Sequence, residues 1–282
     1  MTGATLDEDD YIIGTDDKEI QRLGLQHALW REAALAAWRR AGISPGMQIL
    51  DLGCGPGYAS FDLARLVGPK GRVVAVDQSE HFLEALNAGA AARGLTNIET
   101  VKAPIEDYAW PMSVFDAVWT RWVLCFLPGP EAALAGIDRS LKPGGLLVTQ
   151  EYVDYRSFRL EPAEPIFDTF LDAVQASWRH FGGDPDIARR FPRLFGALGW
   201  AVEEMQPEIH AARPRDAIWQ WPVTWLEEAP DRLVELGFLS AADAADFRAF
   251  VARRCADPHS FMMTPCVLTA RARKPSAPAS AP

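Results

Sequence analysis

The stretch "MQILDLGCGPGYAS", from Met47 to Ser60, decides the fold of this chain. An apolar run reaches an acid, Asp51, and the chain then breaks into glycines at Gly53, Gly55 and Gly57. A glycine turn between a strand and a helix lets a ligand approach the backbone and the helix N-terminus without Cβ clashes. Because doubly wound α/β folds bind ligands at the carboxyl edge of the sheet, we expect a ligand site at this turn.

Strand-like and helix-like segments alternate around this turn. Strands are expected at residues 47–52, 71–77, 98–102, 114–120 and 144–153, and helices at 17–40, 58–67, 79–93 and 131–141. Apolar strands spaced by helices indicate parallel strands buried on both faces of a doubly wound sheet.

The alternation changes after residue 155. There we expect a helical insertion at 156–190, followed by a remainder at 191–272 with strands near 201–211 and 262–272 and a helical lid at about 215–256. An N-terminal helical segment (1–42) and an α/β core (43–155) precede them, and a low-complexity, disordered tail (273–282) follows. The insertions are expected to form a cap over a pocket.

The composition argues against several classes of function. The formal net charge is −10 and the pI is near 5.0, and an acidic protein repels phosphate backbones, so we expect no nucleic-acid partner. The four cysteines form no C-x-x-C pair, which is typical neither of a zinc site nor of a disulfide framework. The acidic N-terminus differs from a signal peptide, and no apolar run approaches a membrane span. We expect a cytoplasmic protein without metal or membrane insertion, and leave a homodimer open.

The glycine pattern narrows the ligand. A dinucleotide fingerprint needs G-x-G-x-x-G, whereas this chain has G-C-G-P-G. Asp51 beside the loop would repel a pyrophosphate and attract a cation. Asp77 closes the second strand, where its carboxylate can accept hydrogen bonds from a ribose diol. These residues indicate a ligand that carries a ribose and a positive charge.

Four segments in this order and spacing resemble the class I S-adenosylmethionine-dependent methyltransferases, in the small-molecule branch that includes the ubiquinone-biosynthesis type. They are "ILDLGCGPG", "VVAVDQS", "FDAVWTRWVL" and "SLKPGGLLVTQEY", and the resemblance covers residues 43–155. It implies a Rossmann-like, doubly wound sheet of seven strands with an antiparallel last strand, an N-terminal helix and a helical cap. It also implies S-adenosylmethionine as cofactor and a small-molecule methyl acceptor.

The resemblance assigns residues to parts of the cofactor. Asp51 and the backbone of Gly53, Cys54, Gly55 and Gly57 would hold the methionine part. Asp77 would take the ribose hydroxyls and Gln78 would lie against the adenine. The family often has an Asp near the adenine amine, where this chain has Pro104. Ile105 and Glu106 remain the expected adenine contacts there.

Other candidates lie around these motifs. Arg121 ends the fourth strand, where it could pair with a carboxylate of the cofactor or of the substrate, or with an insertion. Gln26 shares a helix face with Arg22 and is expected at the cofactor. Tyr11, Trp122 and Tyr152 are expected to contact the substrate.

The implied reaction is an in-line displacement, which alignment and exclusion of water can accelerate. A base is needed only if the acceptor carries a proton at the moment of attack. Glu151 is the first candidate, with substrate anchoring as its alternative, and His210 is the second. Tryptophans at 178, 200, 219, 221 and 225 either pack the insertions or line a slot for a hydrophobic or aromatic acceptor.

Two other functions stay open. Asp77 also suits a nicotinamide-dependent oxidoreductase, although Asp51 and the short glycine motif argue against one. The chain could also bind S-adenosylmethionine without transferring its methyl group, because binding motifs and chemistry are separable.

Overall fold

A seven-stranded sheet forms the body of the molecule in the computed structural model, which describes residues 15–276. The strand order is β3-β2-β1-β4-β5-β10-β7. The strands are β1 (Gln48–Leu52), β2 (Arg72–Asp77), β3 (Ile98–Lys102), β4 (Phe115–Arg121), β5 (Leu141–Asp154), β7 (Ala201–Glu208) and β10 (Cys266–Arg273). Strands β1 to β5 pair in parallel, whereas β10 is antiparallel to both of its neighbours. This confirms the predicted doubly wound sheet with an antiparallel last strand.

Helices cover both faces of the sheet because its strands are apolar on both sides. On one face, Ile49 of β1 packs with α1 (Asp17–Arg40) and α2 (Tyr58–Val67). On the other face, Leu50 belongs to the cluster that includes α4 (Pro130–Ser140) and α6 (Phe191–Ala197). Helix α3 (Glu80–Ala92) packs beside α2 and begins at Ser79, whose hydroxyl caps the N–H of Phe82.

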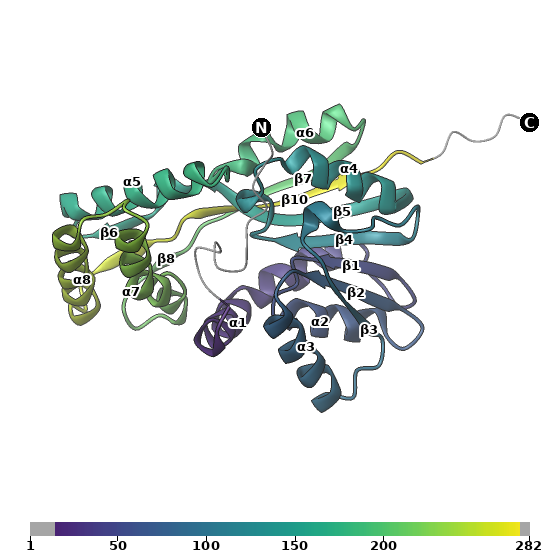
Figure 1. Ribbon diagram of the computed structural model, residues 1–282, viewed down its shortest axis with the longest axis horizontal. Helices are drawn as coiled ribbons and strands as arrows, with labels where there is room; N and C mark the ends of the chain where they lie inside the picture. The colour runs from purple at the N-terminus through teal and green to yellow at the C-terminus, as the bar shows by residue number, and fades with distance from the viewer. Residues whose placement is uncertain (1–14, 277–282) are drawn as a thin grey trace, which may run out of the picture.

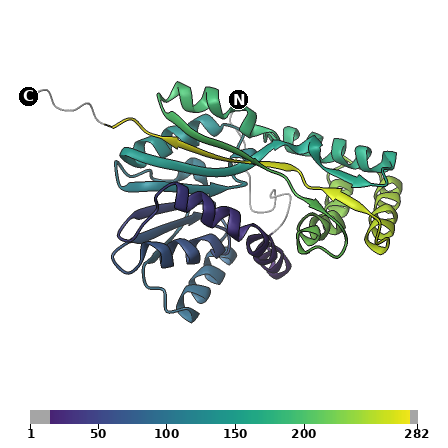
Figure 2. The same cartoon turned by 180° about the vertical axis from the view of Figure 1, so that it is seen from behind.

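A cap extends from the carboxyl end of the sheet (Figures 1 and 2). It contains α5 (Pro165–His180), α7 (Gln220–Glu235) and α8 (Ala241–Ala256), together with a three-stranded sheet of β6 (Arg159–Glu161), β9 (Phe261–Met263) and β8 (Ala211–Ala212). Strands β5 and β10 both continue from the main sheet toward the cap.

The segments that reach the cap differ from their predicted boundaries. The strand predicted at 262–272 is two strands, β9 and β10, separated at Thr264 and Pro265. The strand predicted at 201–211 is likewise divided into β7 and β8. The short strands pair with distant segments of the chain, so no local pattern marks them. No helix within residues 15–276 is long and apolar enough to cross a membrane.

Candidate active site

A cavity of about 230 Å³ lies where the carboxyl ends of β1, β2 and β4 face α1 and the cap. This is the point at which the strand order reverses between β1 and β4, the usual ligand site of an open α/β sheet. The predicted residues in its wall are Gln26, Asp51, Gly53, Cys54, Gly55, Asp77, Gln78, Ile105, Glu106, Arg121, Trp122 and Tyr152. The predicted substrate contact Tyr11 lies outside the described residues.

The glycine loop connects β1 to α2 and needs glycine for steric reasons. Gly57 caps α2 with a φ of 83°, and a Cβ there would collide with Leu86 of α3. Gly53 has a φ of 67°, and a Cβ there would collide with Val123, which follows β4. The loop therefore packs against its neighbours with bare backbone.

Two carboxylates flank this loop in different environments. Asp51 is buried and accepts the hydroxyl of Ser60 at 2.5 Å, and burial raises its pKa to about 7. Asp77 is half-buried, and its two oxygens accept the backbone N–H groups of Gly55 at 2.8 Å and Ser79 at 3.0 Å. Asp77 thus ties the glycine loop to the end of β2.

Arg121 extends from the end of β4 into the cavity wall. One guanidinium nitrogen, Nη2, lies 3.0 Å from Nδ1 of His27, and the other, Nη1, is buried without a hydrogen-bond partner among residues 15–276. The guanidinium lies over Trp122, 5.1 Å from its ring centre. Burial lowers the pKa of Arg121 to about 10, so the side chain stays charged at neutral pH. An unpartnered buried cation nitrogen favours an anionic ligand group.

Aromatic rings form the other end of the cavity. Trp122 stacks on Trp221 of α7 at a centroid distance of 5.4 Å and on Tyr152 of β5 at 5.8 Å. Tyr155 and Trp178 continue the cluster beyond Tyr152. Trp178, Trp221 and Trp225 line the cavity, whereas Trp200 and Trp219 are buried in packing. The cap tryptophans therefore divide between the two predicted roles.

The two predicted bases do not line the cavity, contrary to expectation. Glu151 is fully buried, and its Oε1 accepts the N–H groups of Val123 at 2.9 Å and Leu124 at 2.8 Å. The ring of His210 packs edge-on against Trp30 at 5.3 Å. Glu151 turns away because neighbouring strand residues point to opposite faces, and Tyr152 takes the cavity side. Gly57 is likewise absent from the wall.

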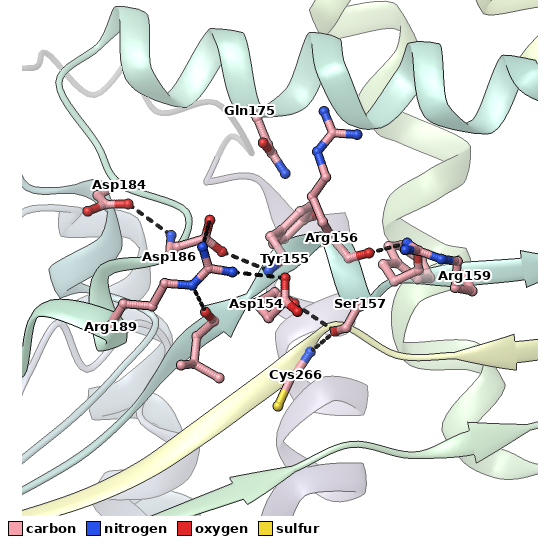
Figure 3. Close-up of polar contacts among 12 residues, drawn as sticks. Asp154, Tyr155, Arg156, Ser157, Arg159, Gln175, Asp184, Asp186, Arg189 and Cys266 are labelled. Carbon is pink, nitrogen blue, oxygen red and sulfur yellow. Dashed lines mark hydrogen bonds and ion pairs between the residues drawn. The ribbon is translucent and has the colours of Figure 1, made fainter.

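A polar junction joins the end of β5 to the cap (Figure 3). Asp186 accepts the backbone N–H of Tyr155 at 2.8 Å, and Arg189 donates to the carbonyl of Val153 at 2.7 Å. The hydroxyl of Ser157 accepts the backbone N–H of Cys266 at 2.7 Å, which links the turn after β5 to β10. The junction holds the segment that carries Tyr155 into the cavity wall.

Comparisons with known proteins agree with this geometry. Residues 43–179 match a family model described as a methyltransferase domain. The chain is 37% identical over 126 residues to the demethylmenaquinone methyltransferase of Lactococcus lactis, across 45% of this chain and 49% of the relative. The comparisons support a class I S-adenosylmethionine-dependent methyltransferase, with the methyltransferase domain at residues 43–179.

Two further comparisons describe the extent of the likeness. An uncharacterised 37.1 kDa protein from a transposon of Streptomyces fradiae is 32% identical over 204 residues, across 70% of this chain and 55% of the relative. The fold matches a candidate methyltransferase of Bacillus halodurans with a TM-score of 0.59 and 19% identity, covering 86% of this chain and 99% of the other. The chain spans about half the length of the curated relatives it matches first.

S-adenosylmethionine is the cofactor of this methyltransferase family, and the polar end of the cavity fits it. The unpartnered Nη1 of Arg121 suits the carboxylate of the methionine part. Asp77 stands at the end of β2 with its oxygens toward the glycine loop, beside the cavity. Within residues 15–276, no group of three or more His, Cys, Asp or Glu side chains is arranged to hold a metal ion.

Sequence reasoning missed several wall residues of this cavity. His27 of α1 and Tyr58 of α2 lie at the cofactor end, while Tyr155 and Phe158 lie at the aromatic end. Tyr155 carried a signal, because it follows Tyr152 directly after the fifth strand. No feature of the sequence pointed to His27, because its place depends on how α1 packs at the carboxyl end of the sheet.

Proposed function

We propose that this protein transfers the methyl group of S-adenosylmethionine to a small, apolar and aromatic acceptor. The observation that carries the proposal is the division of one cavity into two unlike ends. Carboxylates, a glycine loop and a cation form one end, and stacked aromatic rings from the sheet and the cap form the other.

At the polar end, Asp77 accepts the ribose hydroxyls and Arg121 pairs with the carboxylate of the methionine part. Gln78 and the half-buried Ile105 lie against the adenine, and Glu106 stands at its rim. Gln26 closes the site from α1, because its Oε1 accepts Nε1–H of Trp221 at 3.0 Å. This bond connects the N-terminal helix to the cap over the cavity.

At the aromatic end, the acceptor contacts the part of the cavity wall that contains Trp122 and Tyr152. Burial raises the pKa of the phenols of Tyr152 and Tyr155 well above the usual range, so both stay protonated and can donate a hydrogen bond to the acceptor. Neither phenol is suited to remove a proton at neutral pH. The cofactor supplies an activated methyl group when bound. The chain's own residues align the acceptor and exclude water.

Turnover with a panel of acceptors tests the proposal. We would incubate the protein with S-adenosylmethionine and phenols, quinols or aromatic amines, and measure S-adenosylhomocysteine by mass spectrometry. Acceptor-dependent product from an aromatic compound, absent for a polar amine of similar size, is the expected result. Binding of S-adenosylhomocysteine without turnover by any acceptor would favour a cofactor-binding protein that does not methylate.

The proposed function also implies a cellular compartment and a class of binding partner. The cysteines at 54, 125, 255 and 266 are all free thiols, which supports a reducing, cytoplasmic compartment. The acidic net charge of −10 supports a small molecule rather than a nucleic acid as the acceptor.

A further inference from the structure

A chain of polar contacts runs from the cavity into the space between α1 and α2. Arg121 Nη2 lies 3.0 Å from Nδ1 of His27, and Nε2 of His27 lies 3.1 Å from Oδ2 of Asp62. Asp62 is bound in turn by Arg31, whose Nε and Nη2 donate to its two oxygens at 2.6 and 3.0 Å. His27 and Asp62 are buried, with only 6% and 7% of their surfaces exposed.

The two ends of this chain determine which proton His27 carries. A guanidinium can only donate, so Nδ1 of His27 must be the acceptor in its contact with Arg121. A carboxylate can only accept, so Nε2 of His27 must carry the hydrogen that goes to Asp62. The imidazole is therefore neutral and held in one tautomer.

Charged groups of both signs surround His27. Arg121 of β4 and Arg31 of α1 disfavour a positive imidazole, whereas Asp62 of α2 favours one. Arg65 of α2 adds a cation 3.5 Å from Asp62, and Tyr58 stacks on the imidazole at 6.1 Å. Burial is the largest influence, and it lowers the pKa of His27 below 6.5. The neutral form is thus the form present at neutral pH.

We propose that His27 is a positioning residue that aims Arg121 at the carboxylate of the cofactor and releases it when the imidazole is protonated. The proposal rests on the function proposed above, because it requires the cofactor at the polar end of the cavity. With Nη2 held by His27, Nη1 of Arg121, which has no hydrogen-bond partner among residues 15–276, is left for the ligand. Asp62 and Arg31 hold His27 in turn.

Protonation of His27 removes this arrangement. The charged imidazole has donors on both nitrogens, so Nδ1 no longer accepts from Arg121, and two cations then stand side by side. Cofactor affinity should therefore fall as the pH is lowered through the pKa of His27. Each pH unit below that pKa weakens binding by up to about tenfold.

Calorimetric titration with S-adenosylhomocysteine between pH 5 and 8 tests the proposal. His27→Asn is the informative variant, because an amide also offers an acceptor beside a donor but does not titrate in this range. We expect His27→Asn to bind nearly as well as the wild type at pH 8. Between pH 8 and 5, wild-type affinity should fall further than that of His27→Asn.

Two other variants complete the design. His27→Ala, which has neither group, should bind about tenfold more weakly at every pH, and thermal melting checks that it folds. His180→Asn removes an exposed histidine of the cap that does not line the cavity, and should follow the wild-type profile. Asp51, with its pKa raised to about 7, titrates in all four proteins. The difference in pH dependence of affinity between the wild type and His27→Asn therefore reports on His27 alone.

The possible outcomes separate this inference from the proposed function. Equal pH profiles for the wild type and His27→Asn would overturn the role of His27 and leave the methyltransferase proposal intact. Wild-type affinity that rises on acidification relative to that of His27→Asn would mean that the protonated imidazole binds the carboxylate itself, which also overturns it. Absence of S-adenosylhomocysteine binding by the folded wild type at pH 8 would overturn both proposals.

Discussion

Glu151 accepts the backbone N–H of Val123 at 2.9 Å, directly after the turn that carries Trp122. Trp122 has a positive φ of 52°, a conformation that costs a non-glycine residue about 1–3 kcal/mol and persists only where its surroundings hold it. The same Glu151 oxygen accepts the N–H of Leu124. These contacts support a positioning role for Glu151, which holds the turn while Trp122 forms part of the cavity wall.

The burial of Glu151 makes stability depend on pH. Burial raises the pKa of its carboxyl from 4.5 to about 7 in the folded protein. Its contribution to stability is therefore complete below pH 4.5 and is lost as the pH rises through about 7. Glu151→Gln keeps an acceptor for both N–H groups and does not titrate.

We expect the free energy of unfolding of Glu151→Gln, relative to the wild type, to rise between pH 4.5 and about 7 and then level off. The total rise should be about 3.5 kcal/mol at most, from about 1.4 kcal/mol per pKa unit. Urea denaturation at several pH values measures it. Asp51 changes stability in the same direction in both proteins, so its effect cancels. A difference that stays constant with pH would contradict the prediction.

Asp77 should matter for cofactor affinity more than its proposed ribose contact alone implies. Its carboxylate also holds the glycine loop through Gly55, so Asp77→Ala removes two supports of the site. We expect S-adenosylhomocysteine to bind more than tenfold more weakly, equivalent to about 1.4 kcal/mol or more. Glu80→Gln changes an exposed neighbouring acid that does not line the cavity, and should alter affinity less than about twofold. Calorimetry compares the two, and equal affinities would remove Asp77 from the site.

The glycine loop and its two acids were predictable because local chemistry determines their placement. A strand, a glycine turn and a helix bring Asp51 and Asp77 to one edge of a parallel sheet. Glu151 and Tyr152 show where such reasoning stops. They are neighbours on β5, so only one of them faces the cavity, and a strand buried on both sides carries no alternation that indicates which.

The positions of His27 and His210 could not be predicted because they depend on contacts between distant parts of the chain. His27 lies in the site because α1 packs at the carboxyl end of the sheet. Its partners Asp62 and Arg121 are 35 and 94 residues away in sequence. His210 leaves the site because the chain turns there from β7 to the cap sheet. No sequence pattern near His27 or His210 indicates whether the side chain lies in the cavity.

Gly57 and Gly46 provide a matched pair for testing the steric demands of the loop. Both have positive φ angles, 83° and 93°, so alanine at either position meets backbone strain of about 1 kcal/mol or more. Only at Gly57 would the added Cβ collide with a neighbour, Leu86, whereas Gly46 has nothing within 4 Å. We expect Gly57→Ala to lose about 1–3 kcal/mol more stability than Gly46→Ala, from overpacking. Equal losses in chemical denaturation would show that Leu86 moves aside without cost.

The junction at the end of β5 should affect the acceptor end of the cavity and not the cofactor end. Asp186→Ala leaves the N–H of the buried Tyr155 without its acceptor, which costs about 1–3 kcal/mol of stability and loosens Tyr155 in the wall. Asp172→Ala is the matched control, because it removes an exposed ion pair with Arg156 in the same region and should cost less than about 1 kcal/mol.

With an acceptor identified in the turnover screen, Asp186→Ala should raise the acceptor KM severalfold while the affinity for S-adenosylhomocysteine stays within about twofold of the wild type. The reason is distance along the cavity: Tyr155 belongs to the aromatic cluster with Tyr152 and Trp178, whereas Asp77 and the glycine loop stand at the other end. Steady-state kinetics and calorimetry on the same preparations measure the two quantities. If the acceptor KM rises and the affinity for S-adenosylhomocysteine falls by similar factors, the junction supports the whole cavity rather than its acceptor end.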